Sequence, residues 1–186
     1  MSRYIHIEAA TDTILADKSN YSTNTSLNRR GINTTKINKI FISNTHATLP
    51  MVTWIFLKAL EVTRTVNQAT GSSDKWEFDE DIIISEADQV KVGDAVMKSS
   101  GGGVVAYVKT IDSSKKMTLN SSISLTDNDV LYFRDPSDKL TITYPTIPPK
   151  VTFVYEYPFS FNLNRYKLMV KPSVDGSTPD ATIRIE

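Results

Sequence analysis

Histidine is the first residue type to examine for chemistry, because imidazole is a common metal ligand and general base near neutral pH. The chain holds two histidines, His6 and His46, which lie in different segments without His-x-x-x-His spacing. Cysteine is absent, so no thiolate can complete a zinc site or act as a nucleophile. No Gly-x-Ser-x-Gly elbow marks a serine nucleophile. The sequence therefore predicts no catalytic residue, no metal site and no cofactor, with both histidines in strands or at the surface.

Glycine and carboxylate clusters are the next candidates for chemistry. Gly101-Gly102-Gly103 precedes an expected strand and is not followed by Lys-Ser or Lys-Thr, so it predicts a hairpin turn instead of a phosphate loop. Several acidic groups have oxygen ligands suited to calcium but lack the ordered spacing of an EF-hand loop. These groups are Glu77, Asp79, Glu80 and Asp81, then Asp127-Asn128-Asp129, and then Asp135 with Asp138. We interpret them as solvated loop carboxylates.

Aromatic side chains offer a third kind of site, a contact surface. Trp54 lies in an apolar run and is expected in a core, whereas Trp76, beside Glu77, is interpreted as an interface anchor. A carbohydrate- or receptor-binding module would place Trp76, Tyr107 and Tyr132 on one face. A glycan hydrolase is a further alternative, although no pair of acids is singled out by its surroundings as glycosidase machinery.

The charge balance does not favour nucleic acid, an anionic membrane or an acidic substrate as a partner. The chain has 186 residues, with 21 basic and 21 acidic side chains. Its apolar runs are far shorter than the roughly 18 residues that a membrane helix needs, and the N-terminus has no signal-peptide pattern. We expect a soluble, unprocessed protein, in which Arg29 and Arg30 contact an acidic protein neighbour instead of DNA.

Alternation of apolar and polar residues with a period of two dominates the sequence, which indicates β-strands. The runs are rich in β-branched or aromatic residues and bounded by Gly, Pro, Asn, Asp or Ser, as strands between turns are. Short helical turns are considered only at residues 54–60 and 85–87. The predicted strands are 37–43, 52–58, 89–97, 104–111, 130–134, 140–144, 151–155, 166–171 and 182–185.

Charge divides the chain into blocks. Residues 1–70 hold eight basic and four acidic side chains, residues 71–139 eight and thirteen, and residues 140–186 five and four. The acidic block, flanked by turn-forming residues, is expected to be a small inserted β-barrel-like domain. Residues 37–70 and 140–186 would form the jelly-roll-like antiparallel β-sandwich that it interrupts. Residues 1–36 are polar and are expected to be an extended N-terminal arm that gains order on a partner. The predicted fold class is all-β.

Two passages resemble known structural proteins. Residues 37–46 and 52–57 resemble the opening strands of small β-sandwich proteins from tailed phages. The counterpart closing strands are residues 147–154, 159–162, 166–171 and 181–185. The middle block, which contains Val-Gly-Asp-Ala-Val at 92–96 and Leu-Tyr-Phe at 131–133, resembles the small β-modules of phage tail, baseplate and fibre proteins.

The resemblance implies a non-enzymatic structural subunit of a tailed-phage virion, made in the host cytoplasm. It would lie in the neck, tail or baseplate, or on the capsid as an accessory or decoration protein. Its expected partners are portal, neck, tail or capsid subunits, in a homo-oligomeric or multi-copy symmetric assembly. The candidate interface residues are Tyr4, Arg29, Arg30, Trp76, Tyr107 and Tyr132. The alternative function is a receptor- or carbohydrate-binding module of a phage fibre or baseplate.

Overall fold

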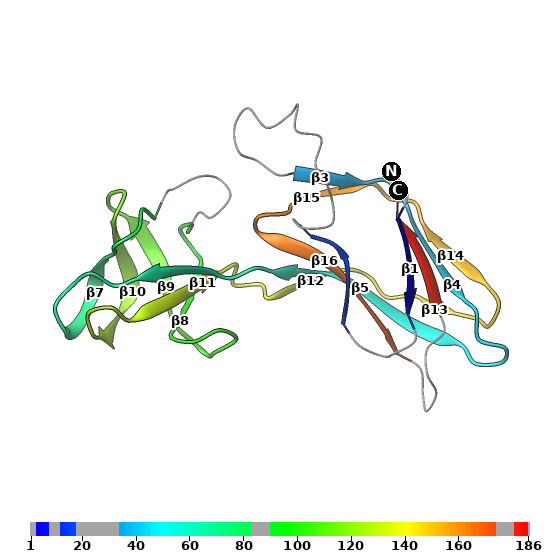
Figure 1. The fold of residues 1–186 in the computed structure, drawn as a ribbon, viewed down its shortest axis with the longest axis horizontal. Helices are drawn as coiled ribbons and strands as arrows, with labels where there is room; N and C mark the ends of the chain where they lie inside the picture. Colours follow the sequence, from blue (N-terminus) through cyan, green and yellow to red (C-terminus); the bar gives the residue numbers. More distant parts are fainter. Residues whose placement is uncertain (1–2, 8–11, 18–33, 83–89, 174–180, 186) are drawn as a thin grey trace. The chain divides into compact units, whose positions relative to one another are not determined.

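The structure, a computed structural model, describes residues 3–7, 12–17, 34–82, 90–173 and 181–185. Every regular element in these ranges is a β-strand and the sheets are antiparallel, so the all-β prediction is confirmed (Figure 1). The same ranges contain no helix with the length and hydropathy needed to cross a membrane. The helical turn considered at 54–60 is wrong, because residues 54–59 form the second part of strand β5 (Met51–Ala59). Residues 85–87 lie outside the described residues.

The chain divides into two compact units. Unit 1 contains the described residues up to Lys58 and from Lys139 onward, and unit 2 contains the described residues of 59–138. The strands of unit 1, besides β5, are β1 (Arg3–Ile7), β2 (Thr13–Ala16), β3 (Thr34–Ile37), β4 (Ile40–Asn44), β12 (Lys139–Thr143), β13 (Thr146–Ile147), β14 (Thr152–Tyr155), β15 (Phe159–Asn162), β16 (Tyr166–Ser173) and β17 (Ala181–Ile185). The strands of unit 2 are β6 (Val62–Thr65), β7 (Gly71–Glu77), β8 (Ala95–Met97), β9 (Val104–Ile111), β10 (Lys116–Leu125) and β11 (Val130–Arg134).

Two sheets and a two-stranded ladder make up unit 1. The first sheet has the strand order β1-β17-β4-β14, and the second has the order β12-β5-β16-β2, with β13 also paired to β5. Strand β15 pairs with β3. Figure 1 shows the first and last strands of the chain, β1 and β17, side by side. In the first sheet Ile42 lies opposite Ile183 on one side and Phe153 on the other, so apolar residues align across three strands.

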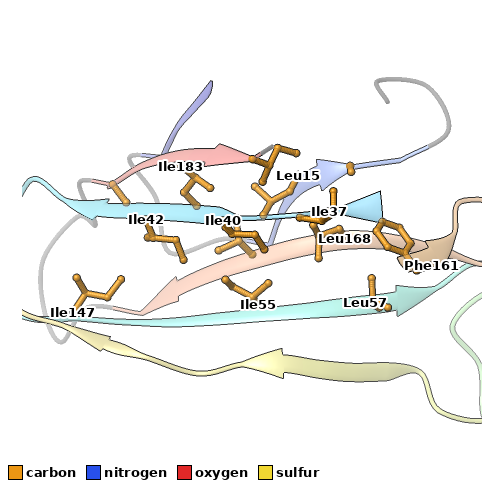
Figure 2. Close-up of a cluster of buried hydrophobic side chains, with 14 of the residues drawn as sticks. Leu15, Ile37, Ile40, Ile42, Ile55, Leu57, Ile147, Phe161, Leu168 and Ile183 are labelled. Atoms are coloured by element: carbon orange, nitrogen blue, oxygen red, sulfur yellow. The ribbon is translucent and has the colours of Figure 1, made fainter. Parts of the chain in front are cut away.

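The two sheets of unit 1 contribute to one hydrophobic core. Strands β4 and β17 alternate buried and partly exposed residues, which is the pattern of a strand with one buried face. Figure 2 shows Ile40 and Ile42 of β4 facing Ile55 and Leu57 of β5 across the space between the sheets. Each such side chain stabilises the fold by about 1.5–3 kcal/mol when it is fully buried. This packing determines which face of each sheet points outward.

Unit 2 is built on one curled sheet with the strand order β6-β11-β8-β9-β10-β7. Its two outermost strands are linked just beyond their ends. Val66 and Phe78 form a β-bridge, and the amide of Asn67 donates to the carbonyl of Glu77 at 2.9 Å. The link gives the sheet a barrel-like form and reduces the number of unpaired backbone groups at its edges.

The core of unit 2 is filled by aromatic side chains. Trp76, Phe78 and Phe133 are among its largest fully buried residues. The rings of Phe78 and Phe133 meet edge to face with centroids 6.1 Å apart, a favourable geometry for an aromatic pair. The indole N–H of Trp76 donates to the carbonyl of Ser73 at 2.8 Å, which satisfies its polar atom. Among the described residues, the core clusters of the two units have no member in common.

Two turns in unit 2 depend on glycine. The segment after β8 leads into β9, which pairs with β8 in antiparallel fashion, so the hairpin predicted at Gly101-Gly102-Gly103 is confirmed. Gly101 has φ 66° and Gly93, in the turn before β8, has φ 91°, values that side-chain-bearing residues rarely adopt. In that earlier turn the carboxylate of Asp94 accepts the amide of Lys91 at 2.9 Å.

Parts of the chain pair differently from the sequence-based expectation. Residues 3–7 and 13–16, expected in the arm, form β1 and β2, which pair with β17 and β16. Leu15 on β2 is fully buried, which explains why this strand joins unit 1. Residues 18–33 of the expected arm lie outside the described residues. Strand β6, expected with the sandwich, pairs with β11 because Val62 belongs to the core of unit 2.

Candidate functional site

One exposed sheet face in unit 1 gathers aromatic and cationic side chains. The strand registers align Tyr4, Arg184, Phe41 and Val154 across β1, β17, β4 and β14, so these side chains share one face of the sheet. It is the face opposite the core, because the adjacent residue Ile42 points into the core. Tyr4 is 65% exposed and Val154 36%. We call this surface the outer face of the first sheet.

The guanidinium of Arg184 lies close to two rings on this outer face. Its Cζ is 4.0 Å from the ring centroid of Phe41 and 5.9 Å from that of Tyr4. Its Nη1 donates to the hydroxyl of Tyr4 at 3.3 Å. Cation–π contacts of this kind favour a fixed side-chain position. Arginine and tyrosine are also among the residues that most often dominate binding energy at protein interfaces.

A polar row runs beside the aromatic row. His6, Thr182, Ser43 and Thr152 occupy the next register positions with the same orientation. The hydroxyls of Ser43 and Thr152 are hydrogen-bonded at 2.8 Å, and Nδ1 of His6 is 3.4 Å from the hydroxyl of Thr182. A hollow of about 230 Å³ is lined by Tyr4, Phe41, Ser43, Thr152, Thr182 and Arg184. The outer face therefore offers a cation, aromatic rings and hydroxyl groups together.

The outward side of the second sheet is covered by its own side chains. The Nζ atom of Lys139 lies 5.0 Å from the ring centroids of both Trp54 and Phe56, and 3.9 Å from the carboxylate of Asp12. The indole of Trp54 donates to the hydroxyl of Thr141 at 2.9 Å. The prediction that Trp54 lies in the core is wrong, because Trp54 is on the opposite side of β5 from the core and is only half-buried.

Two of the three aromatic residues expected to share a face of unit 2 do so. Tyr107 lies opposite Ala95 and Tyr132 lies opposite Met97, two positions apart on β8, so both tyrosines point to the same side of the sheet. Tyr107 is 41% exposed. Tyr132 borders a hollow of about 250 Å³, which is lined by Lys98, Ser99, Leu125, Asp129, Val130, Leu131 and Tyr132.

Trp76 is not part of this tyrosine face. It is 1% exposed, lies opposite Met117 on β10 and belongs to the core of unit 2. The interpretation of Trp76 as an exposed interface anchor is therefore wrong. Its polar neighbours in the sequence point away from the core because side chains alternate along a strand. Arg29 and Arg30 lie outside the described residues.

Several carboxylates of unit 2 hold its turns in place. Asp112 accepts hydrogen bonds from the hydroxyls of Thr118 and Thr110, both at 2.7 Å, and these bonds hold its pKa below the usual value. Asp129 accepts the amide of Thr126 at 2.8 Å, and its pKa is lowered chiefly by that bond. Both carboxylates therefore serve as turn acceptors.

Two glutamates, Glu80 and Glu61, also accept hydrogen bonds that hold loop segments of unit 2 in place. Burial opposes the ionisation of Glu80, but hydrogen bonds from the amide of Thr65 at 2.8 Å and its hydroxyl at 2.9 Å outweigh this effect, so the pKa of Glu80 lies below its usual value. Glu61 accepts the hydroxyl of Ser100 at 2.6 Å and the amide of Gly101 at 2.8 Å. These bonds give both acids a structural role that their spacing in the sequence did not reveal.

His46 also has a structural contact. Its Nδ1 accepts the amides of Thr48 at 3.2 Å and Leu49 at 3.0 Å, so it organises the loop between β4 and β5. Within the part of the chain that the structure describes, no three His, Asp or Glu side chains come together as a possible metal site.

Two exposed surfaces thus stand out among the described residues, the outer face of the first sheet and the tyrosine face of unit 2. No family model matches the chain, and no curated protein matches it. Sequence reasoning selected Tyr4, Tyr107 and Tyr132 but missed Phe41 and Arg184. Period-two alternation shows that Phe41 and Arg184 are on outward positions, but only the pairing of β17 with β4 shows that they are neighbours.

Proposed function

We propose that this chain is a non-enzymatic structural subunit of a tailed-phage virion that binds neighbouring virion proteins. Its place would be the neck, tail or baseplate, or the capsid surface as an accessory protein, after synthesis in the host cytoplasm. Portal, neck, tail or capsid subunits are the proposed partners. Several copies would occupy symmetry-related positions, as subunits of closed assemblies do.

The observation that carries this proposal is the outer face of the first sheet. It presents Tyr4, Phe41 and Arg184 at adjacent positions on three strands of a sheet whose other face packs into a core. Such a sheet holds the three side chains in fixed relative positions, so little conformational entropy is lost when a partner binds. Tyrosine and arginine are enriched at the centres of protein interfaces, which favours a protein as the occupant.

We propose further that unit 1 is a jelly-roll-like sandwich and that unit 2 is a domain inserted into it. The support is the order of strands along the chain. The first sheet combines β4 with β14 and β17, and the second combines β5 with β12 and β16, so each sheet draws strands from both sides of unit 2. Because strands from both sides of unit 2 pair within each sheet, unit 1 can keep its strand order while the intervening residues fold on their own.

Incorporation of variants into particles tests the proposed function. A phage lacking the gene for this chain is complemented with the wild-type chain, with Tyr4→Ala or with Tyr144→Ala, and the chain is quantified in purified particles. Tyr144 is a matched control, because it is also a tyrosine of unit 1 with 65% exposure but does not line the hollow of the outer face. We expect Tyr4→Ala alone to reduce incorporation. Absence of the wild-type chain from particles would rule out the proposal.

A receptor- or carbohydrate-binding module is the second candidate function. It is favoured by the hollow of about 250 Å³ on unit 2, where Tyr132, Lys98 and Asp129 supply a ring and two charged groups. Aromatic rings beside hydrogen-bonding groups are suited to sugars, which have apolar faces and hydroxyl edges. Glycan-array binding that is lost in Tyr132→Ala but kept in Tyr107→Ala would support this function over the first.

A further inference from the structure

Strand β14 has a free edge at one side of the first sheet. Within the described residues it pairs only with β4, and it is the last strand in the order β1-β17-β4-β14 (Figure 1). A strand in this position presents unpaired amide and carbonyl groups along its outer side, which another strand can join. Its surroundings are apolar and open, since Val151 is 43% exposed, Val154 36% and Tyr157 76%.

One hydrogen bond shows which backbone groups of β14 face β4 and which face the free edge. The carbonyl of Val151 accepts the amide of Asn44 at 3.0 Å, so this carbonyl and the backbone groups of Phe153 point toward β4, while the amide of Val151 donates to Pro148. Consecutive residues of a strand point their backbone groups to opposite edges. The amides and carbonyls of Thr152 and Val154 are therefore directed to the free edge.

The segment 150–156, which contains β14, carries opposite charges at its two ends. Lys150 precedes β14 and Glu156 follows it, and both are exposed. Glu156 forms an exposed ion pair with Lys39 at 3.0 Å, while the side chains of Lys39 and Glu156 remain 45% and 64% accessible. When an antiparallel strand of the same sequence lies alongside, the positive end of each strand meets the negative end of the other. The edge is therefore complementary to itself.

We propose that β14 pairs with β14 of a second copy of this chain in antiparallel fashion across a two-fold axis. The axis passes beside Phe153, which places Thr152 opposite Val154 of the second copy. Because these two residues direct their backbone groups to the free edge, each such pair exchanges two N–H···O bonds, and the symmetric pair adds two more. Lys150, in the turn before β14, and Glu156, just after it, then lie beside the oppositely charged end of the second copy. The two first sheets join into one continuous sheet, an isologous contact.

This inference deepens the proposed function, on which it rests for its biological setting, by naming a surface through which copies associate. Self-association can be measured with the purified full-length chain, without a virion. A chain that dimerises but is absent from particles would keep this inference and lose the proposed function. A chain that is present in particles but does not pair through β14 would keep the proposed function and lose this inference.

Disulfide trapping tests the register. The natural chain has no cysteine, so every cross-link reports on introduced thiols. Hydrogen-bonded residues on antiparallel strands have Cα atoms about 5.5 Å apart, within the range of a disulfide. We expect the double variant T152C/V154C to form a covalent dimer under mild oxidation, and V154C alone to form little. Efficient trapping of V154C alone, or no trapping of the double variant, would overturn the proposed register.

Sedimentation equilibrium tests the pairing itself. Val154→Pro removes an amide that points to the free edge and makes no bond to β4, so the fold should persist, as circular dichroism would confirm. Two N–H···O bonds across the axis are lost, each equivalent to about a three- to tenfold change in affinity, so the dimer dissociation constant should rise about ten- to a hundredfold. Val154→Thr is the matched control and should leave the constant unchanged, because it keeps the amide and the branched shape.

Charge reversal provides a second, independent variant. Lys150→Glu brings like charges together at both ends of the paired strands and should weaken the dimer about threefold or more. The double reversal K150E/E156K restores opposite charges across the axis and should recover the affinity. A wild-type chain that remains monomeric at millimolar concentration, or a dimer that none of these variants changes, would overturn the proposal.

Discussion

Leu131→Ala should destabilise unit 2 and leave unit 1 unaffected. Leu131 is fully buried on β11, between β6 and β8, in a core cluster that contains no residue of unit 1. A buried Leu→Ala change removes contacts and leaves a cavity, at a cost of about 2–5 kcal/mol. Because Leu131 is held in a curled sheet with paired strands on both sides, collapse around the cavity is restricted, and we expect about 3 kcal/mol.

The two tryptophans make this prediction measurable, since Trp54 belongs to unit 1 and Trp76 to unit 2. Fluorescence-monitored urea unfolding in a Trp54→Phe background reports on unit 2, and in a Trp76→Phe background on unit 1. With a urea m-value of about 1.5 kcal/mol/M, 3 kcal/mol lowers the unfolding midpoint by about 2 M. Leu131→Ala should produce this shift in the Trp76 signal only.

Two controls complete the experiment. Ile42→Ala, in the core of unit 1, should shift the Trp54 transition and leave the Trp76 transition unchanged. Val130→Ala, next to Leu131 but 41% exposed, should change the stability of unit 2 by less than about 0.5 kcal/mol. If Leu131→Ala shifted both transitions equally, the reasoning from two separate cores would be refuted.

Three further predictions concern single side chains. Asn44→Ala should lower the free energy of unfolding of unit 1 by about 1.5–3 kcal/mol, seen in the Trp54 signal, because its buried amide donates to Leu49 and Ile147 at 2.8 and 3.0 Å. Gly93→Ala should cost unit 2 about 1–2 kcal/mol in urea unfolding, since its φ of 91° strains any residue with a Cβ. The pKa of Asp129 is lower in the folded than in the unfolded chain, so its stabilising contribution is full above the unfolded pKa of about 4 and is lost as pH falls through the folded value. The midpoint of unit 2 should therefore fall on acidification, and less steeply in Asp129→Asn; an identical pH dependence in both proteins would contradict this.

Strand positions could be predicted where alternation was strong. The predicted strands 104–111 and 130–134 coincide with β9 and β11, because β-branched and aromatic residues alternate there and turn residues bound them. Strand β7 could not be found in this way. Its sequence, Gly-Ser-Ser-Asp-Lys-Trp-Glu, has one large apolar residue, and the strand exists because it pairs along β10 and buries Trp76. Tertiary pairing outweighed weak local propensity at this point.

The candidate surfaces also depend partly on local sequence and partly on tertiary pairing. A carbohydrate- or receptor-binding module would place Trp76, Tyr107 and Tyr132 on one face, and the structure puts Tyr107 and Tyr132 on one side of the sheet but buries Trp76. The outer face of the first sheet depends on contacts between the two ends of the chain, such as Tyr4 with Arg184. No local pattern encodes a pairing over that separation, because alternation fixes only the orientation of each side chain.

The central claim, that the chain is a structural subunit of a tailed-phage virion, is tested most directly by quantitative mass spectrometry. Particles of the phage that encodes the chain are purified on a density gradient, and peptides of the chain are measured against those of the major capsid protein. We predict a constant ratio equivalent to several copies per particle, retained after a salt wash. Peptides that are absent from particles and recovered only from the unassembled fraction of the lysate would contradict the claim.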